Sequence, residues 1–349
     1  MLRTGVLLCL IGFAVSSPPV SKTRDQIQAF KEALEKSRTD DGVRLDSRIL
    51  ANPEANIWEN SGKFQGDIVL DDEQIEALVA SYAGANSRAA YVVPGRRWPG
   101  NVMVYEFGHN EFNAAQQQAI LRAMGWVEHF SCVRFRLRRP NEQNYVLITG
   151  KPDGCYARVG YHATGHIHVL NLARATPGHG CLNNIVIIHE LLHNLGFFHM
   201  QSAYERYNYV RINWNNIVPG MAHNFHRLQR NEVNLLGLPY EYHSSMHYST
   251  HAFSTNGQPT IVATRSFPGV MGHMVYVTHW DWVRLRRHYN CPGAWDERQI
   301  QEVKEEVDRT LPLMMAEASQ TEDVDQDIEK NDSEINVVNQ DEIVKQQKI

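Results

Sequence analysis

The sequence contains no apolar run that approaches the roughly 20 residues which a helix needs to cross a bilayer. The nearest candidate is an eleven-residue run at residues 5–15, just after Arg3. Ala14 and Ser16 have the small-residue spacing of a signal-peptidase site. We therefore predict a secretory signal peptide at residues 1–16, a secreted, extracellular protein, and no membrane span.

The chain also lacks the excess of positive charge that is typical of nucleic-acid-binding proteins, since its formal net charge is −5. The formal charge is distributed unevenly along the chain: it is −3 for residues 1–88, +8 for residues 89–291 and −10 for residues 292–349. All 17 histidines lie between His109 and His288. We expect no nucleic-acid partner, and we expect any imidazole chemistry in the middle segment.

Cysteine is scarce, with five in the whole chain, and no C-x-x-C pair occurs. That absence argues against a zinc cluster made of cysteines. Cys9 would leave with the signal peptide, so an even set remains for an oxidising compartment. We expect two disulfides, and the spacing leaves three connectivities open among Cys132, Cys155, Cys181 and Cys291.

The segment before the middle one is polar and contains two stretches with helical spacing, at residues 26–36 and 72–82. It runs from residue 17 to Arg88, a basic residue that precedes two small ones and so suits a processing protease. We predict that residues 17–88 are a pro-segment. A small helical domain that is retained in the mature protein is the alternative.

The C-terminal segment, residues 292–349, is strongly acidic and has few aromatic residues. Helical spacing is confined to a short patch at residues 299–309. Such a composition is typical of solvated extensions. We predict an acidic, disordered tail.

The middle segment combines extended and helical patterns. A helical stretch at residues 114–126 lies among the extended runs, and a last helix is expected near residues 281–289. This mixture predicts an α+β domain over residues 89–291. The extended runs are residues 102–107, 132–138, 145–149 and 167–172.

The middle segment also contains the pattern H-E-x-x-H-x-x-G-x-x-H, which begins at His189. Residues four apart share one face of a helix, so His189 and His193 can direct two nitrogens at one zinc ion, with Glu190 beside it. Gly196 can end the helix and return the chain, so that His199 supplies a third nitrogen. Three nitrogen ligands leave a position for water, which Glu190 can deprotonate for peptide hydrolysis.

Most of the other histidines, His168 and His226 among them, are better interpreted as hydrogen-bonded core residues. None of them has a partner at ligand spacing followed by a glycine turn. Further along the chain, residues 242–248 read Y-H-S-S-M-H-Y. After an extended zinc motif, a turn with this methionine and tyrosine completes the metzincin signature, which adds Met246 and Tyr248 to the candidate site.

Together these motifs resemble the astacin family of zinc metalloendopeptidases, a group of metzincins, over the whole of residues 89–291. The resemblance implies a two-subdomain α+β fold. A mixed twisted sheet and the active-site helix would form the upper subdomain, and an irregular lower half would end in a helix. It also implies one Zn²⁺ per catalytic domain, with Glu190 as general base.

The resemblance implies further roles outside the histidine motif. Met246 would form a hydrophobic floor below the metal, and Tyr248 would be a fifth, displaceable ligand that stabilises the oxyanion. Precursors in the family carry F-x-G-D, which residues 64–67 match, so Asp67 would occupy the metal in a latent zymogen. The implied disulfides are Cys132 with Cys291 and Cys155 with Cys181.

Two positions depart from the family pattern. Met200 follows the third histidine, where the family usually has a glutamate that meets the N-terminus created by activation, so we expect that ionic contact to be absent. Residues 271–274 lack the arginine that helps some members favour acidic residues just after the scissile bond. An acidic preference therefore does not follow from the resemblance.

These features predict a secreted, monomeric, zinc-dependent endopeptidase that cleaves protein or peptide substrates after an activating protease acts near Arg88. Extended substrates would pair with an edge strand, for which residues 167–172 are the candidate. The alternative is a catalytically weak or inactive zinc-binding protein that sequesters a protein partner. Met200 favours the alternative. Glu190 and the three-histidine set argue against it, because structural zinc normally has four protein ligands.

Overall fold

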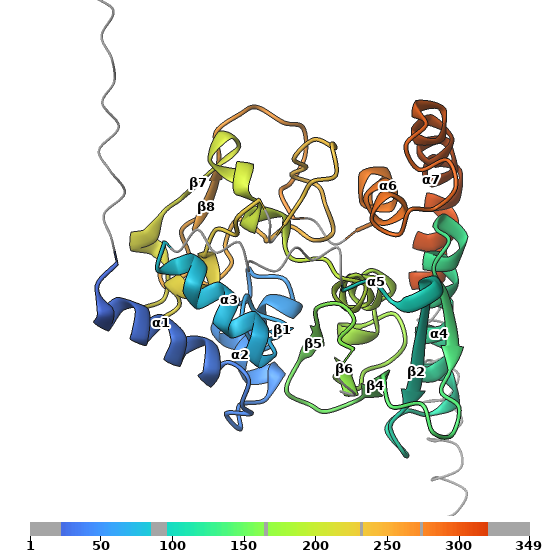
Figure 1. The fold of residues 1–349 in the computed structure, drawn as a ribbon, viewed down its shortest axis with the longest axis horizontal. Coiled ribbons are helices and arrows are strands. Elements are labelled where there is room, and N and C mark those ends of the chain that lie inside the picture. The colour runs from blue at the N-terminus through green and yellow to red at the C-terminus, as the bar shows by residue number, and fades with distance from the viewer. Residues whose placement is uncertain (1–21, 85–95, 164–166, 231–232, 273–274, 320–349) are drawn as a thin grey trace, which may run out of the picture.

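The computed structural model describes five stretches of the chain, residues 22–84, 96–163, 167–230, 233–272 and 275–319. Figure 1 shows how they are arranged. The predicted signal peptide, the predicted processing site at Arg88 and residues 320–349 lie outside the described residues. Within the described stretches, no helix combines the length and the apolar character that a bilayer span requires.

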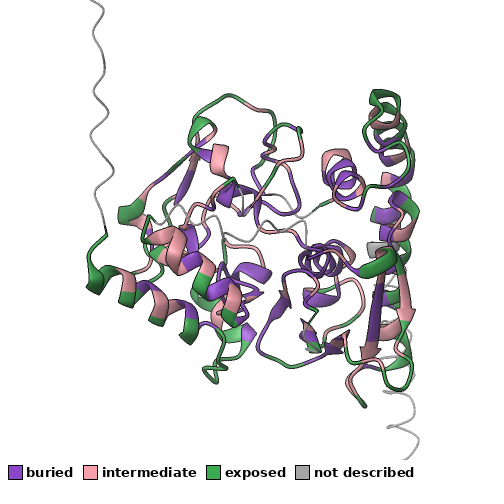
Figure 2. Cartoon of the chain, in the orientation of Figure 1, coloured by how far each residue is buried: buried purple, intermediate pink, exposed green. Residues whose placement is uncertain are grey.

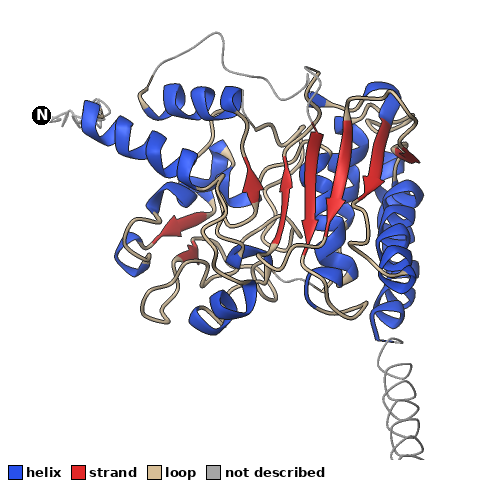
Figure 3. Ribbon diagram, turned by 90° about the horizontal axis from the view of Figure 1, so that it is seen from below, coloured by secondary structure: helices blue, strands red, loops and turns tan. Residues whose placement is uncertain are grey.

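Five strands of the middle segment and one strand of the predicted pro-segment form a six-stranded mixed sheet, and Figure 3 shows its strands side by side. Its strands are β1 (Ile68–Val69), β2 (Val102–Phe107), β3 (Arg134–Leu137), β4 (Tyr145–Thr149), β5 (Cys155–Arg158) and β6 (Ile167–Leu172). They lie in the order β1-β5-β6-β4-β2-β3, and only the pairing of β5 with β6 is antiparallel. The nearly continuous burial of β4 agrees with its apolar sequence, since a strand covered on both faces does not alternate.

The prediction that residues 167–172 form an edge strand is wrong, because β6 lies between β4 and β5. Among the strands of the middle segment, β5 and β3 lie at the two edges, and β5, which has four residues, was not predicted. Its edge is covered by β1, a strand of the predicted pro-segment that pairs with it in parallel. Ile68 is opposite Ala157, and Val69 is opposite Arg158.

Two helices, α4 (Ala114–Phe130) and α5 (Asn184–Asn194), pack against each other beside the sheet. Asn113 caps α4 and forms a reciprocal capping box with Gln116. Every residue of α5 from Ile185 onward is buried. Since a helix that is covered all round is normally apolar, the polar residues inside α5 need a specific reason to be there.

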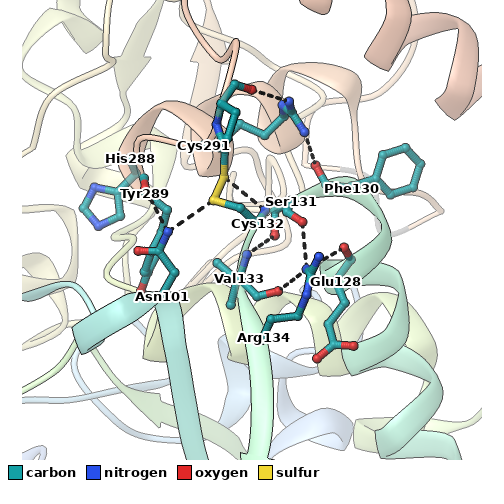
Figure 4. Close-up of a disulfide and its surroundings, with 12 residues drawn as sticks. Asn101, Glu128, Phe130, Ser131, Cys132, Val133, Arg134, His288, Tyr289 and Cys291 are labelled. Atoms are coloured by element: carbon teal, nitrogen blue, oxygen red, sulfur yellow. Dashed lines mark hydrogen bonds between the residues drawn. A yellow bond between two sulfur atoms is a disulfide. The ribbon is translucent and has the colours of Figure 1, made fainter.

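The other half of the middle segment, residues 200–291, is mostly irregular. It contains a two-stranded ribbon of β7 (Val210–Ile212) and β8 (Ile261–Ala263), and it ends in α6 (His279–His288). The disulfide Cys132–Cys291 joins its end to the sheet half, as Figure 4 shows. The second disulfide is Cys155–Cys181, so both pairs are those implied by the resemblance. The two-subdomain α+β fold is confirmed.

The prediction of a disordered segment from residue 292 onward is wrong for residues 297–319. They form α7 (Glu297–Ser319), which packs against α6. Val303, Val307 and Met314 are buried in the main core, and their spacing of four and seven residues places them on one helix face. Figure 2 shows this buried stripe beside exposed residues. The acidic average of the segment concealed an amphipathic helix.

The predicted pro-segment contains α1 (Arg24–Lys36), α2 (Leu45–Ala51) and α3 (Asp72–Tyr82). Its small hydrophobic cluster, which includes Phe30 and Leu34, is completed by Val159 and Leu228 of the middle segment. A buried ion pair of 2.6 Å between Asp71 and Arg96 joins the two parts. The pro-segment therefore uses the middle segment to build its core.

Replacing Met314 by alanine should lower the free energy of unfolding by about 2–3 kcal/mol, because Met314 is buried in the core. The matched control is Met315→Ala at an exposed neighbouring position, which should change it by less than about 0.5 kcal/mol. Urea unfolding of the full chain measures both. Equal, small effects would contradict the packing of α7.

Candidate metal centre

The three candidate histidines come from α5 and from the turn that follows it. His189 and His193 lie one turn apart on α5. Gly196 ends the helix with a φ of 107°, a conformation that side chains disfavour. A Cβ at this position would also lie 2.9 Å from Nε2 of His288. The turn therefore requires glycine, and it returns the chain so that His199 faces the helix.

The Nε2 atoms of the three histidines converge. That of His189 lies 3.2 Å from that of His193 and 3.4 Å from that of His199. Asp67 of the pro-segment places Oδ2 at 2.9, 3.4 and 3.3 Å from the Nε2 atoms of His189, His193 and His199 respectively. All four residues are completely buried. The structure thus brings together the histidines and the aspartate that the sequence singled out.

The opposite ring nitrogens determine which way these imidazoles face. Nδ1 of His189 lies 2.7 Å from the carbonyl oxygen of Ser245, and Nδ1 of His193 lies 2.7 Å from that of Phe197. Nδ1 of His199 lies 3.0 Å from Oε1 of Gln65. Because these oxygens can only accept, each Nδ1 must carry the proton, which leaves each Nε2 with a free lone pair.

Several buried polar atoms here have no hydrogen-bond partner among the described residues. They are both carboxylate oxygens of Glu190, Oδ1 of Asp67 and the hydroxyl oxygen of Tyr248. Buried polar groups are nearly always paired, so these atoms indicate a group that the protein itself does not supply. Three unprotonated nitrogens beside a carboxylate match the donors that zinc prefers. The residues therefore fit a zinc ion held by the three histidines and Asp67.

Burial changes the ionisation of the same groups. It lowers the pKa of His193 to about 4 and holds the pKa values of His189 and His199 well below their usual range. These imidazoles are neutral at pH 7, which is the form that binds a metal. Burial, together with the charge of Asp67, raises the pKa of Glu190 well above its usual value.

Asp281 of α6 holds the turn at residues 244–248 in place. Its carboxylate accepts hydrogen bonds from Oγ of Ser244 at 2.6 Å and from the backbone N–H of Ser245 at 2.8 Å. The carbonyl of Ser245 in turn holds His189, so this contact reaches the metal centre. Asp281 lies within a predicted helix, and nothing in its sequence neighbourhood indicated this role.

Tyr248 lies beside the centre, and Met246 belongs to the same turn. Met246 is buried, and its carbonyl oxygen accepts the N–H of Met200 at 2.7 Å. Tyr248 is completely buried, with its ring centroid 5.1 Å from that of His199. Met200 is buried too, so an apolar side chain occupies the position after the third histidine.

Sequence reasoning missed Trp58 and Glu59 of the pro-segment. The Trp58 ring stacks on His189 at 4.2 Å and on His199 at 4.7 Å between centroids. The Glu59 carboxylate accepts hydrogen bonds from the backbone N–H and the hydroxyl of Ser249, and burial raises its pKa to about 7. The one available signal was that Trp58 is the sole tryptophan of residues 17–88.

The fold and this centre define a metzincin-type metalloproteinase, in which a sheet subdomain and an irregular subdomain meet at a three-histidine site. The chain belongs to the astacin family of peptidases. The model of that family, described as "Astacin", matches residues 91–290. The resemblance seen in the sequence is confirmed.

Two curated relatives support this assignment, and one solved structure is also similar. Zinc metalloproteinase nas-6 of Caenorhabditis elegans is 32% identical over 263 residues, which cover 74% of this chain and 72% of that protein. Zinc metalloproteinase nas-4 of the same organism is 32% identical over 231 residues, covering 66% and 70%. Among solved structures, high choriolytic enzyme 1, a hatching enzyme zinc-protease from Oryzias latipes, shares 34% identity with a TM-score of 0.49. That match covers 56% of this chain and 93% of the hatching enzyme.

The zinc assignment predicts that His199→Ala, which removes one of the converging nitrogens, leaves the purified uncleaved chain with much less than one zinc per molecule after dialysis. His226→Ala is the control, because His226 is a half-buried histidine that packs on Phe30 and Tyr82 away from the centre. It should keep one zinc per chain. Atomic absorption measures both, and equal zinc contents would contradict the site.

Proposed function

We propose that this metalloproteinase is a secreted zinc endopeptidase that is made as a latent zymogen. Residues 1–16 would be the signal peptide, residues 17–88 the pro-segment and residues 89–291 the catalytic domain. An activating protease would cleave near Arg88, and the mature enzyme would act as a monomer on proteins or peptides. The observation that carries the proposal is the buried cluster of three histidines, Asp67 and the unpaired Glu190.

His189, His193 and His199 would hold the metal in both forms, and Asp67 would hold it in the uncleaved chain. Bound zinc would supply a Lewis acid that polarises a carbonyl and lowers the pKa of a coordinated water to about 7. The neutral imidazoles and their fixed Nδ1 protons support this assignment, because they leave three lone pairs directed at one place.

Glu190 is the group suited to move the proton. It follows the first ligand on α5, and neither of its oxygens is bound to another described residue. Asp67 contributes to the raised pKa of Glu190 in the uncleaved chain, so departure of the pro-segment removes that contribution. Glu190 would then accept a proton from the attacking water and deliver it to the leaving amine.

Tyr248 would assist at the oxyanion. Its hydroxyl is buried without a partner among the described residues, and its ring lies beside His199. A phenol is a hydrogen-bond donor, and a donor placed where negative charge develops stabilises the transition state.

Latency would come from more than one contact of the pro-segment. Asp67 lies among the ligands, Trp58 covers two of their rings, and β1 occupies the edge of β5. The backbone N–H of Ala157 donates to the carbonyl of Asp67 at 2.9 Å. After removal of the pro-segment this edge would offer its backbone groups to an extended substrate, which supports protein or peptide substrates.

Replacing Glu190 by alanine should leave zinc bound but lower the rate of casein cleavage by the Arg88-processed protein by about 10²–10⁴-fold. A chelator should abolish casein cleavage by the processed wild type, and the uncleaved wild-type chain should not cleave casein. Glu205→Ala, a carboxylate paired with Arg230 near the surface, is the control that should retain activity.

Processed wild-type protein that binds zinc but never cleaves casein would favour the alternative, a zinc-binding protein that sequesters a partner. A fully active Glu190→Ala variant would contradict the assigned base. Both outcomes are read from the same set of digests.

Removing the carboxylate of Asp67 should give the uncleaved chain partial peptidase activity. Uncleaved Asp67→Ala should cleave a short fluorogenic peptide faster than the uncleaved wild type, but more slowly than the processed enzyme, because Trp58 still covers two ligands. Initial rates before any processing measure this. If uncleaved Asp67→Ala cleaves the peptide no faster than the uncleaved wild type, the carboxylate of Asp67 does not inhibit the enzyme.

A further inference from the structure

We propose that Gln65 is a positioning residue that orients His199 for zinc in the uncleaved chain. The pro-segment would then help to load the metal as well as to block the site. The inference rests on the proposed zinc function, and it assigns a separate role to a residue that is neither a ligand nor a catalytic group. Its basis is the hydrogen bond from Nδ1 of His199 to Oε1 of Gln65.

The side chain of Gln65 is completely buried and bonded at both ends. While Oε1 accepts from His199 at 3.0 Å, Nε2 donates to Oγ of Ser202 at 2.8 Å. In this orientation of the amide, Oε1 faces the imidazole and the hydroxyl of Ser202 accepts from Nε2. Since an amide oxygen is only an acceptor, the contact assigns the proton to Nδ1 and directs the lone pair of Nε2 toward the centre.

Backbone contacts of residues 63–66 fix the position of Gln65 beside His199. Its φ is 49°, in the left-handed region, and its N–H donates to Oδ1 of Asn224 at 2.8 Å. Lys63 and Gly66 close the turn with two reciprocal backbone hydrogen bonds. A Cβ at Gly66 would lie 2.8 Å from Cα of Glu59, so the turn can approach this closely only with glycine.

His199 is the only one of the three histidines whose Nδ1 partner comes from the pro-segment. The partners of His189 and His193 are carbonyls of Ser245 and Phe197, which remain after processing. Removal of the pro-segment therefore takes away Gln65 together with Asp67. The uncleaved chain should bind zinc more tightly than the mature enzyme for two independent reasons, and only one of them is the carboxylate ligand.

The test is the zinc affinity of the uncleaved full chain, measured by competition with a chromogenic chelator. Gln65→Ala should weaken the affinity by about 10–100-fold, the usual effect of losing a partner of a metal-bound histidine. Gln65→Glu keeps an acceptor for Nδ1 and should retain the wild-type affinity within about threefold. The matched control is Gln74→Ala, which removes a buried pro-segment glutamine bonded to Val159 away from the centre and should have no effect.

Processing provides an internal control, because the mature enzyme no longer contains residue 65. Mature protein from the Gln65→Ala chain should bind zinc as the wild-type mature protein does. Unchanged affinity in uncleaved Gln65→Ala, or an equal loss in Gln65→Glu or Gln74→Ala, would overturn the inference while leaving the zinc function intact. Failure of the uncleaved wild type to bind zinc would instead overturn the proposed function.

Discussion

The structure depends on the confinement of three imidazole lone pairs to one small, fully buried volume. The Nε2 atom of His189 lies 3.2 Å from that of His193 and 3.4 Å from that of His199, and a carboxylate lies among them. Without a cation these atoms would repel one another and remain unsolvated. The surrounding elements can be understood as supports for this arrangement: α5 fixes two rings, the turn at Gly196 brings the third, and carbonyl acceptors set their orientation.

The predicted pro-segment contributes side chains to this centre in the full chain. It supplies a sixth strand to the sheet, an aromatic ring stacked on His189 and His199, and an acceptor for Nδ1 of His199. It also adds two buried carboxyl groups, Glu59 and Asp67, to that of Glu190, and burial raises the pKa of each. Burial disfavours the charged forms of these acids, and a cation bound among them would favour those forms.

The sequence predicted what is local and missed what depends on distant contacts. The zinc motif was recognisable because its spacing follows the period of one helix, and β2, β4 and α3 have the bounds expected from their patterns. Strand neighbours were not predictable, since nothing in residues 167–172 records which strand lies beside them. Asp281, Trp58 and Gln65 act through partners far away in the sequence, so no spacing could reveal them. The helical patch predicted at residues 299–309 lies within α7, but the extent and packing of this helix were missed because net charge averages over both of its faces.

The contacts of the turn at residues 244–248 explain how the structure accommodates Met200. A buried methionine next to the third ligand makes no demand for a charged partner, and its backbone N–H is satisfied by Met246. The turn is instead held by Asp281, which also pairs with the buried Arg284 at 3.1 Å. Both charged groups belong to α6, within the middle segment, and Asp281 is the one that contacts the turn. In the full chain the turn at residues 244–248 is therefore held by a carboxylate of the middle segment, without an ionic contact at position 200.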